Sequence, residues 1–187
     1  MGWYEGYAHH FDKRGNIDRK KEARAVFSDE SCILKDALVG TTYYAAIKTK
    51  DGTVYIYVAL TSTREGRYFA YKPMEASMGP YQYNCPESIL KLNTDHSGFT
   101  DEWIQKCRDN TARKKEWARI QKGATILKIT FPWETKFHKE GESVIVTKGY
   151  RRRKAKNPSV RWQDDYYYYA AGLMKQLFEA GAIEIIK

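Results

Sequence analysis

The residues best suited to chemistry form a dense run of cations near the carboxyl end of the chain. The stretch KGYRRRKAKNPSVRW, residues 148–162, holds seven Lys and Arg and no acidic residue. Cations beside phosphates release condensed counterions, so each well-placed cation adds affinity for a polyanion. Arginine also makes bidentate contacts with phosphates and with guanine edges. The stretch therefore predicts a nucleic-acid-binding surface; the other interpretation is a solvated loop.

The predicted binding residues lie in this stretch and in a basic run before it. Tyr150 and Trp162 flank the arginines, and their rings are suited to stacking on bases or on guanidinium planes. Residues 106–122 include seven basic and two acidic residues. This excess fits a binding surface and a solvated helix surface equally. The predicted set is Lys148, Tyr150, Arg151, Arg152, Arg153, Lys154, Lys156, Arg161, Trp162, Arg113, Lys114 and Lys115.

Metal and cofactor chemistry have little support in the sequence. His9, His10 and Asp12, with Asp18 or Glu22, suggest a metal-dependent nuclease. However, adjacent histidines point in different directions on most backbones, and no further carboxylate cluster completes a hard-metal site. The sequence contains no Walker loop, GxGxxG, GxSxG or HExxH motif. We therefore expect no metal, no cofactor and no catalytic residue.

The three cysteines do not suggest a disulfide framework or a zinc site. Cys32, Cys85 and Cys107 are far apart and odd in number, and no CxxC pair is present. This pattern fits reduced thiols in a cytoplasm. No apolar run approaches the roughly 20 residues that a membrane helix needs, and no signal peptide is visible. We expect a cytoplasmic protein without a membrane partner.

Four consecutive tyrosines, residues 166–169, precede the last apolar segment. We expect them on a helix that Asp164 and Asp165 cap. Consecutive residues point all round a helix, so some of the rings must be buried and others exposed. One interpretation is packing against a sheet, and the other is a stacking or protein-contact surface.

The elements that position these groups are clearest in the first half of the chain. A helix is predicted over 17–27 with Asn16 as its N-cap. Two β-rich runs joined by Lys50, Asp51 and Gly52 predict a hairpin. In the second run, alternation predicts that Val54, Ile56 and Val58 pack inward while the opposite face presents tyrosines. A third strand is expected to end at Pro73.

The second half predicts a smaller mixed unit. A long helix is expected from Thr100 or Asp101 to Gly123, followed by strands near 124–132 and 142–150. A helix and a short last strand complete the chain. The predicted fold class is α+β: an antiparallel β-meander packed by helices, then a smaller basic α+β unit. The predicted divisions are an N-terminal domain over 1–99, a linking helix over 100–123 and a C-terminal unit over 124–187.

Several stretches resemble a little-characterised family of small proteins from phages, plasmids and integrated elements of Gram-positive bacteria. The resemblance covers roughly the first 120 residues and lies in MGW, GNIDRKKE, LVGTTYYAA, YKPMEASMGPYQYNCPESILKL and EWIQKCRDN. It implies roles such as DNA handling, regulation or defeating host defences, including CRISPR systems. It supplies no activity and no catalytic residue.

Three functional hypotheses follow from these observations. The first is a non-enzymatic protein that binds nucleic acid or a nucleoprotein complex through the basic stretch. The second is an anti-CRISPR inhibitor that grips a host effector protein through exposed aromatic residues. The third is a metal-dependent nuclease that uses the region of His9 to Asp12. The sequence leaves the oligomeric state open.

Overall fold

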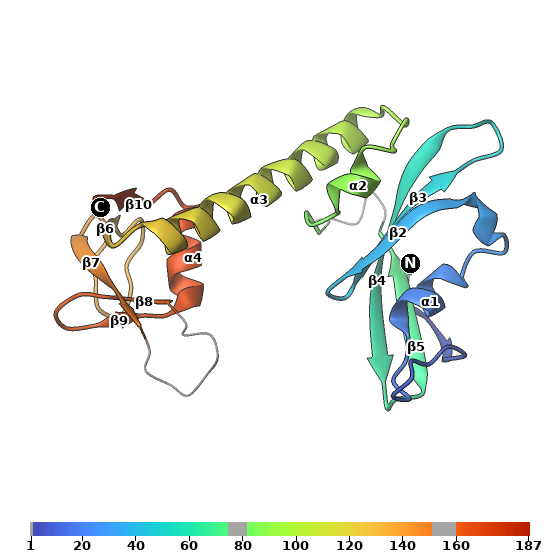
Figure 1. Cartoon of the computed structure of the whole chain (residues 1–187), viewed down its shortest axis with the longest axis horizontal. Helices are drawn as coiled ribbons and strands as arrows, with labels where there is room; N and C mark the ends of the chain where they lie inside the picture. The colour runs from blue at the N-terminus through green and yellow to red at the C-terminus, as the bar shows by residue number, and fades with distance from the viewer. Residues whose placement is uncertain (1, 75–81, 151–159) are drawn as a thin grey trace. The chain divides into compact units, whose positions relative to one another are not determined.

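The computed structural model confirms the α+β class, with two antiparallel sheets and four α-helices in its described part (Figure 1). The structure describes residues 2–74, 82–150 and 160–187. The chain divides into two compact units, residues 1–110 and residues 111–187. The longest helix, α3 (Gly98–Gly123), begins in the first unit and ends in the second.

The sheet of the N-terminal unit has five antiparallel strands. Their spatial order is β1 (Tyr4–Tyr7), β5 (Tyr68–Pro73), β4 (Val54–Arg64), β3 (Thr42–Lys48) and β2 (Ile33–Val39). The β3–β4 hairpin confirms the prediction from the sequence. Gly52 adopts φ 93°, a conformation that side-chain-bearing residues avoid, and the Asp51 carboxylate accepts a hydrogen bond from the Thr53 amide at 3.1 Å.

Helices cover both faces of this sheet. Tyr43 and Tyr44, adjacent on β3, are both fully buried and belong to different core clusters. The prediction that β4 would present Tyr55 and Tyr57 on its other face is wrong, because both side chains are half-buried and pack against a core cluster on that face. Tyr57 is half-buried, with its ring 5.0 Å from that of Phe27, because the segment that carries α1 (Arg19–Arg24) packs over that face. The short helix α2 (Glu87–Leu90) and the start of α3 pack over the other face.

Helix α1 is shorter than the sequence predicted. Asp18, rather than Asn16, is its N-cap: the Asp18 carboxylate accepts a hydrogen bond from the Lys21 amide at 3.1 Å. A 3₁₀ turn over Glu30–Cys32 then leads into β2.

The C-terminal unit has a second five-stranded antiparallel sheet. Its order is β10 (Ile183–Ile185), β6 (Ile126–Thr130), β7 (Ser143–Tyr150), β8 (Val160–Gln163) and β9 (Tyr168–Tyr169). Helix α4 (Ala171–Glu179) and the end of α3 enclose a core with this sheet. Leu127, Val146, Met174 and Leu177 are almost fully buried there.

The tyrosine run is not helical, which corrects the prediction. Tyr168 and Tyr169 form β9, and α4 begins two residues later with Ala170 as its N-cap. Asp164 does not cap that helix. Its carboxylate accepts hydrogen bonds from the amides of Tyr166 and Tyr167 at 2.7 and 2.6 Å, which closes a turn between β8 and β9. None of the helices in the described ranges is long and apolar enough to span a bilayer.

Candidate nucleic-acid interface

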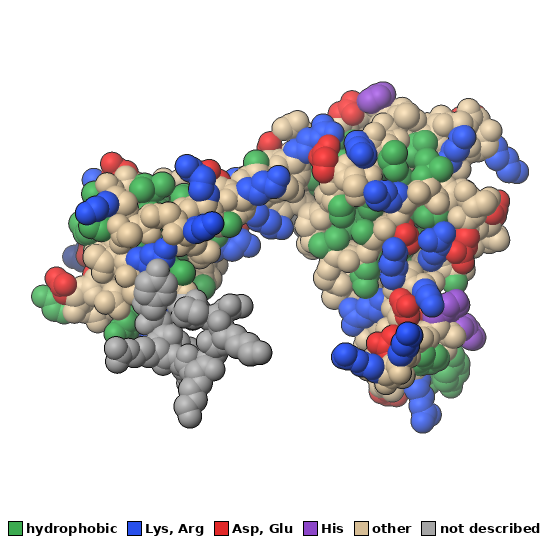
Figure 2. Space-filling model, in the orientation of Figure 1, with side chains coloured by type: hydrophobic (Ala, Val, Ile, Leu, Met, Phe, Trp, Pro, Cys, Tyr) green, Lys and Arg blue, Asp and Glu red, His purple; other side chains and the backbone are tan. Residues whose placement is uncertain are grey.

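The net positive charge of the protein lies in the C-terminal unit. Residues 111–187 contain 17 Lys and Arg against 8 Asp and Glu, whereas residues 1–110 contain 15 of each. The C-terminal unit therefore carries the whole formal excess of +9. Figure 2 shows Lys and Arg side chains over the visible face of this unit. A charge separated in this way favours polyanion binding by one unit rather than by the whole surface.

Most of the predicted basic stretch lies outside the described residues. This applies to Arg151, Arg152, Arg153, Lys154 and Lys156, and also to the side chain of Tyr150. Its two ends are described: Tyr150 on β7 pairs with Val160 on β8. The stretch thus joins two adjacent antiparallel strands.

The described cations at the two ends of the stretch have different surroundings. The ammonium of Lys148 donates a hydrogen bond to the carbonyl oxygen of Lys122 at 3.0 Å, in the last turn of α3. This contact fixes the end of the helix, so Lys148 has a structural role. The guanidinium of Arg161 lies 5.1 Å from the centre of the Tyr168 ring. Arg161 therefore combines charge with an exposed aromatic surface.

Trp162 cannot stack on a bound base, which corrects the prediction for this residue. Its side chain is 2% exposed and belongs to the core of the C-terminal unit. Successive residues of a strand point to opposite faces. On β8, Trp162 therefore points inward while Arg161 points to the opposite face.

The three predicted cations of α3 are exposed. No ion pair joins Arg113, Lys114 or Lys115 to an acidic side chain within the described ranges. Other basic residues of this helix are paired: Lys106 with Glu102, Arg108 with Glu87 and Arg119 with Glu116. Within the described residues, the central cations of α3 and Lys122 are therefore exposed without an ion pair to an acidic side chain.

An exposed aromatic group lies on the C-terminal unit at a place that the basic residues did not indicate. We call Phe137, Tyr166 and Tyr167 the aromatic platform. The rings of Phe137 and Tyr167 are stacked at 4.7 Å with 27° between their planes, and Tyr166 lies 6.4 Å from Tyr167. The Lys136 ammonium is 5.4 Å from the Phe137 ring. The tyrosine run pointed to part of this group, but no sequence signal indicated Phe137.

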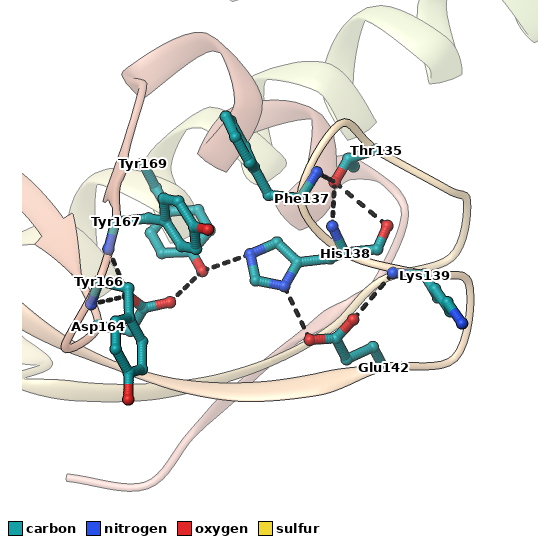
Figure 3. A network of polar contacts seen from close by, with 9 residues as sticks. All are labelled: Thr135, Phe137, His138, Lys139, Glu142, Asp164, Tyr166, Tyr167 and Tyr169. Carbon is teal, nitrogen blue, oxygen red and sulfur yellow. Dashed lines mark hydrogen bonds and ion pairs between the residues drawn. The ribbon is translucent and has the colours of Figure 1, made fainter.

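A polar network beneath the platform joins the two loops that carry it (Figure 3). His138 is 8% exposed; its Nδ1 lies 3.0 Å from Glu142 Oε1 and its Nε2 lies 2.9 Å from the Tyr169 hydroxyl. That hydroxyl donates a hydrogen bond to Asp164 Oδ2 at 2.5 Å. Phe131 stacks on the imidazole at 4.3 Å. The network thus connects the β6–β7 loop to the turn between β8 and β9.

The acidic members of the network favour their ionised forms. Partial burial is the largest influence on Asp164 and raises its pKa. Hydrogen bonds from the Tyr169 hydroxyl and from the amides of Tyr166 and Tyr167 together outweigh burial, and the pKa lies below its ordinary value. The hydrogen bond with His138 is the main cause of a lowered pKa at Glu142. Burial, followed by the nearby Asp164, raises the pKa of Tyr169 and keeps its hydroxyl protonated.

The acidic residues of the His9–Asp12 region serve local structure. The buried carboxylate of Glu22 accepts hydrogen bonds from the amides of His9 and His10. The Asp12 carboxylate accepts hydrogen bonds from the amides of Arg14 and Asn16 at 2.8 and 2.9 Å. No group of three or more His, Cys, Asp or Glu in the part of the chain that the structure describes can hold a metal ion.

Comparison with known proteins gives a partial match. The chain is 32% identical over 98 residues to a dephospho-CoA kinase from Aquifex aeolicus (strain VF5). The match covers 49% of this chain and 50% of the kinase, so the chain spans about half the length of the curated relative. No protein-family model and no solved structure matches. The sequence of this chain contains no Walker loop of the kind that holds nucleotide phosphates.

Proposed function

We propose that the protein binds nucleic acid, free or within a nucleoprotein complex, through its C-terminal unit. It acts by occupying the nucleic acid rather than by catalysis, as a cytoplasmic protein of a mobile genetic element. The observation that carries this proposal is the placement of the whole charge excess in residues 111–187. Cations that neutralise phosphates give an affinity that falls steeply with salt.

The test is a salt titration of binding to labelled oligonucleotides, followed by fluorescence anisotropy. Replacing Arg151, Arg152 and Arg153 with Ala should reduce the slope of log affinity against log salt by about 2, since each lost phosphate contact contributes about 0.7–0.9. The matched control replaces three exposed cations of the neutral unit, Lys13, Arg14 and Lys50, with Ala. The control should keep the wild-type slope. Equal slopes for both triple variants, or no binding at about 50 mM salt, would overturn the proposal.

A second candidate function is inhibition of a host defence effector, such as a CRISPR effector, by direct protein contact. The N-terminal unit is neutral and exposes a group of aromatic residues at and beside the edge strand β1: Trp3, Tyr4, Tyr7 and Phe11. A hollow of about 310 Å³ lies beside this strand and is lined in part by Tyr4, Tyr7 and Tyr71. Exposed aromatic surface of this kind is typical of protein contacts.

The two candidates differ in how a complex responds to nuclease and salt. A pull-down of an effector, with and without its guide RNA, separates them. Binding through the cationic unit should require nucleic acid and fall at high salt. Capture that survives nuclease and high salt, and that falls when Trp3 and Tyr7 are changed to Ala, supports the protein-contact function instead.

A further inference from the structure

The aromatic platform of the C-terminal unit presents ring surface to solvent in an ordered arrangement. Tyr166 is 85% exposed and Phe137 is 56% exposed, while Tyr167 is partly covered between them. Phe137 stacks on Tyr167, and Tyr166 follows at a tilt of 52°. Tyr168, the next residue in sequence, is 67% exposed and has Arg161 against its ring, on the side of β9 opposite Tyr169. Rings grouped in this way offer several flat surfaces for another flat group.

Two of the exposed rings each have a cation beside them. Lys136 lies near Phe137, and Arg161 lies near Tyr168, each within 5.5 Å of the ring centre. A nucleotide combines a flat base with a charged phosphate, so a ring with an adjacent cation complements both parts. The C-terminal unit carries all of the +9 charge. A protein partner would need acidic patches at matching positions to gain the same electrostatic attraction.

The platform is held in place from beneath. Tyr167 rests edge-on against the buried His138 imidazole, with 5.8 Å between ring centres. Phe137 is the residue before His138, and Tyr166 is tied through its amide to Asp164 (Figure 3). Because the network fixes both loops, the rings lose little conformational freedom when they contact a ligand.

We infer that this platform takes unpaired bases, which makes single-stranded nucleic acid the preferred ligand class of the C-terminal unit. The inference rests on the proposed nucleic-acid-binding function and specifies its ligand. In a duplex, each base is already stacked on its neighbours, and its faces are closed to protein rings. In a single strand the faces are open, and each base stacked on an aromatic side chain contributes about 1–3 kcal/mol.

The experiment compares a 12-nucleotide single strand, as DNA and as RNA, with a 12-base-pair duplex by fluorescence anisotropy over a range of salt. Tyr166→Ala should weaken single-strand binding by about 5- to 150-fold at every salt concentration, because stacking is lost while no charge is removed. The slope against log salt should stay unchanged. Tyr166→Phe keeps the ring and should bind as wild type, and Tyr7→Ala, at an exposed tyrosine of the other unit, should also bind as wild type.

The outcomes separate this inference from the proposed function. If wild type binds duplex and single strand equally and Tyr166→Ala changes neither, the inference is wrong while the nucleic-acid function stands. If no nucleic acid binds, both fail. A loss in Tyr166→Ala that Tyr166→Phe shares would point to the hydroxyl rather than the ring and would also overturn the stacking argument. Phe137→Ala gives a second reading, since the platform predicts a loss of the same kind at that ring.

Discussion

Removing the Tyr169 hydroxyl is the most direct test of the polar network beneath the aromatic platform. Tyr169→Phe removes one oxygen and leaves the buried ring in place. A hydrogen bond to a charged group contributes about 1.5–3 kcal/mol, and the half-buried position of Asp164 favours the lower end. The variant also leaves His138 Nε2 without its partner at a site where the imidazole is 8% exposed, which costs a further 1–3 kcal/mol or so. We expect the C-terminal unit to lose about 3 kcal/mol.

Hydrogen exchange read by mass spectrometry measures this loss in the intact chain. Peptides from β6 and β7 should exchange about 100-fold faster in Tyr169→Phe, since each factor of ten corresponds to about 1.4 kcal/mol. Peptides from β3 and β4 in the other unit should be unchanged and serve as an internal reference. Tyr168→Phe is the matched control, because its hydroxyl belongs to an exposed side chain. A change in Tyr169→Phe no larger than in Tyr168→Phe would refute the role given to the network.

The same network predicts how acid affects stability. The pKa values of Asp164 and Glu142 are lowered in the folded protein from ordinary values of 3.8 and 4.5. A carboxyl whose pKa is lowered by folding stabilises the fold above its unfolded pKa, and that stability is lost as pH falls through the folded pKa. The C-terminal unit should therefore weaken below about pH 5. In Tyr169→Phe, stability should fall less steeply with decreasing pH below about pH 4, because Asp164 has lost a hydrogen bond that lowers its pKa in the folded protein. An identical acid profile would contradict the pairing.

Three further predictions test the fold that supports the site. Trp162→Ala should destabilise the C-terminal unit by about 3–5 kcal/mol, visible as faster exchange in β7 and β8, because the indole fills the core. Gly52→Ala should cost about 1 kcal/mol or more in denaturant unfolding, whereas Gly123→Ala, in a helix, should not, because the strain lies in the positive φ of the turn. Asp36→Asn should lower the local stability of α1 by about 1 kcal/mol, because the Asp36 carboxylate pairs with the Lys20 ammonium at 2.9 Å. Hydrogen exchange of the α1 amides measures this change, and equal protection in the variant and the wild type would count against the pairing.

The parts of the fold predicted from the sequence are those set by local patterns. The turn at Asp51 and Gly52 follows from backbone chemistry that acts within a few residues, because Gly52 supplies the positive φ that the turn needs. Helix α3 ends at Gly123 as predicted, although Gly123 does not adopt a positive φ. Helix α1 shows the limit of such rules. Asp18 and Asn16 are both good N-caps, and the choice between them depends on Asp12, which draws the Asn16 amide into a preceding turn.

The remaining features depend on contacts between distant residues. Tyr43 and Tyr44 are both buried because separate helices cover the two faces of their sheet, and alternation along one strand cannot report this. Trp162 and Tyr169 face inward together because β8 and β9 are paired in that register. The His138 network joins residues up to 31 positions apart. The sequence therefore identified the tyrosine run as unusual but not the loop that supplies Phe137 beside it.

The net positive charge lies in the C-terminal unit, whereas exposed aromatic residues lie on both units. This difference bears on the kind of partner that the protein binds. The proposed binding of nucleic acid would by itself account for the cations and the platform of the C-terminal unit. It leaves unexplained why a neutral unit exposes Trp3, Tyr4 and Tyr7 along an edge strand, where association through the open edge is a hazard. A nucleoprotein complex supplies both a polyanion and a protein surface. If that is the target, Tyr7→Ala and Tyr166→Ala should weaken binding to the complex independently, whereas free nucleic acid should respond to Tyr166→Ala alone.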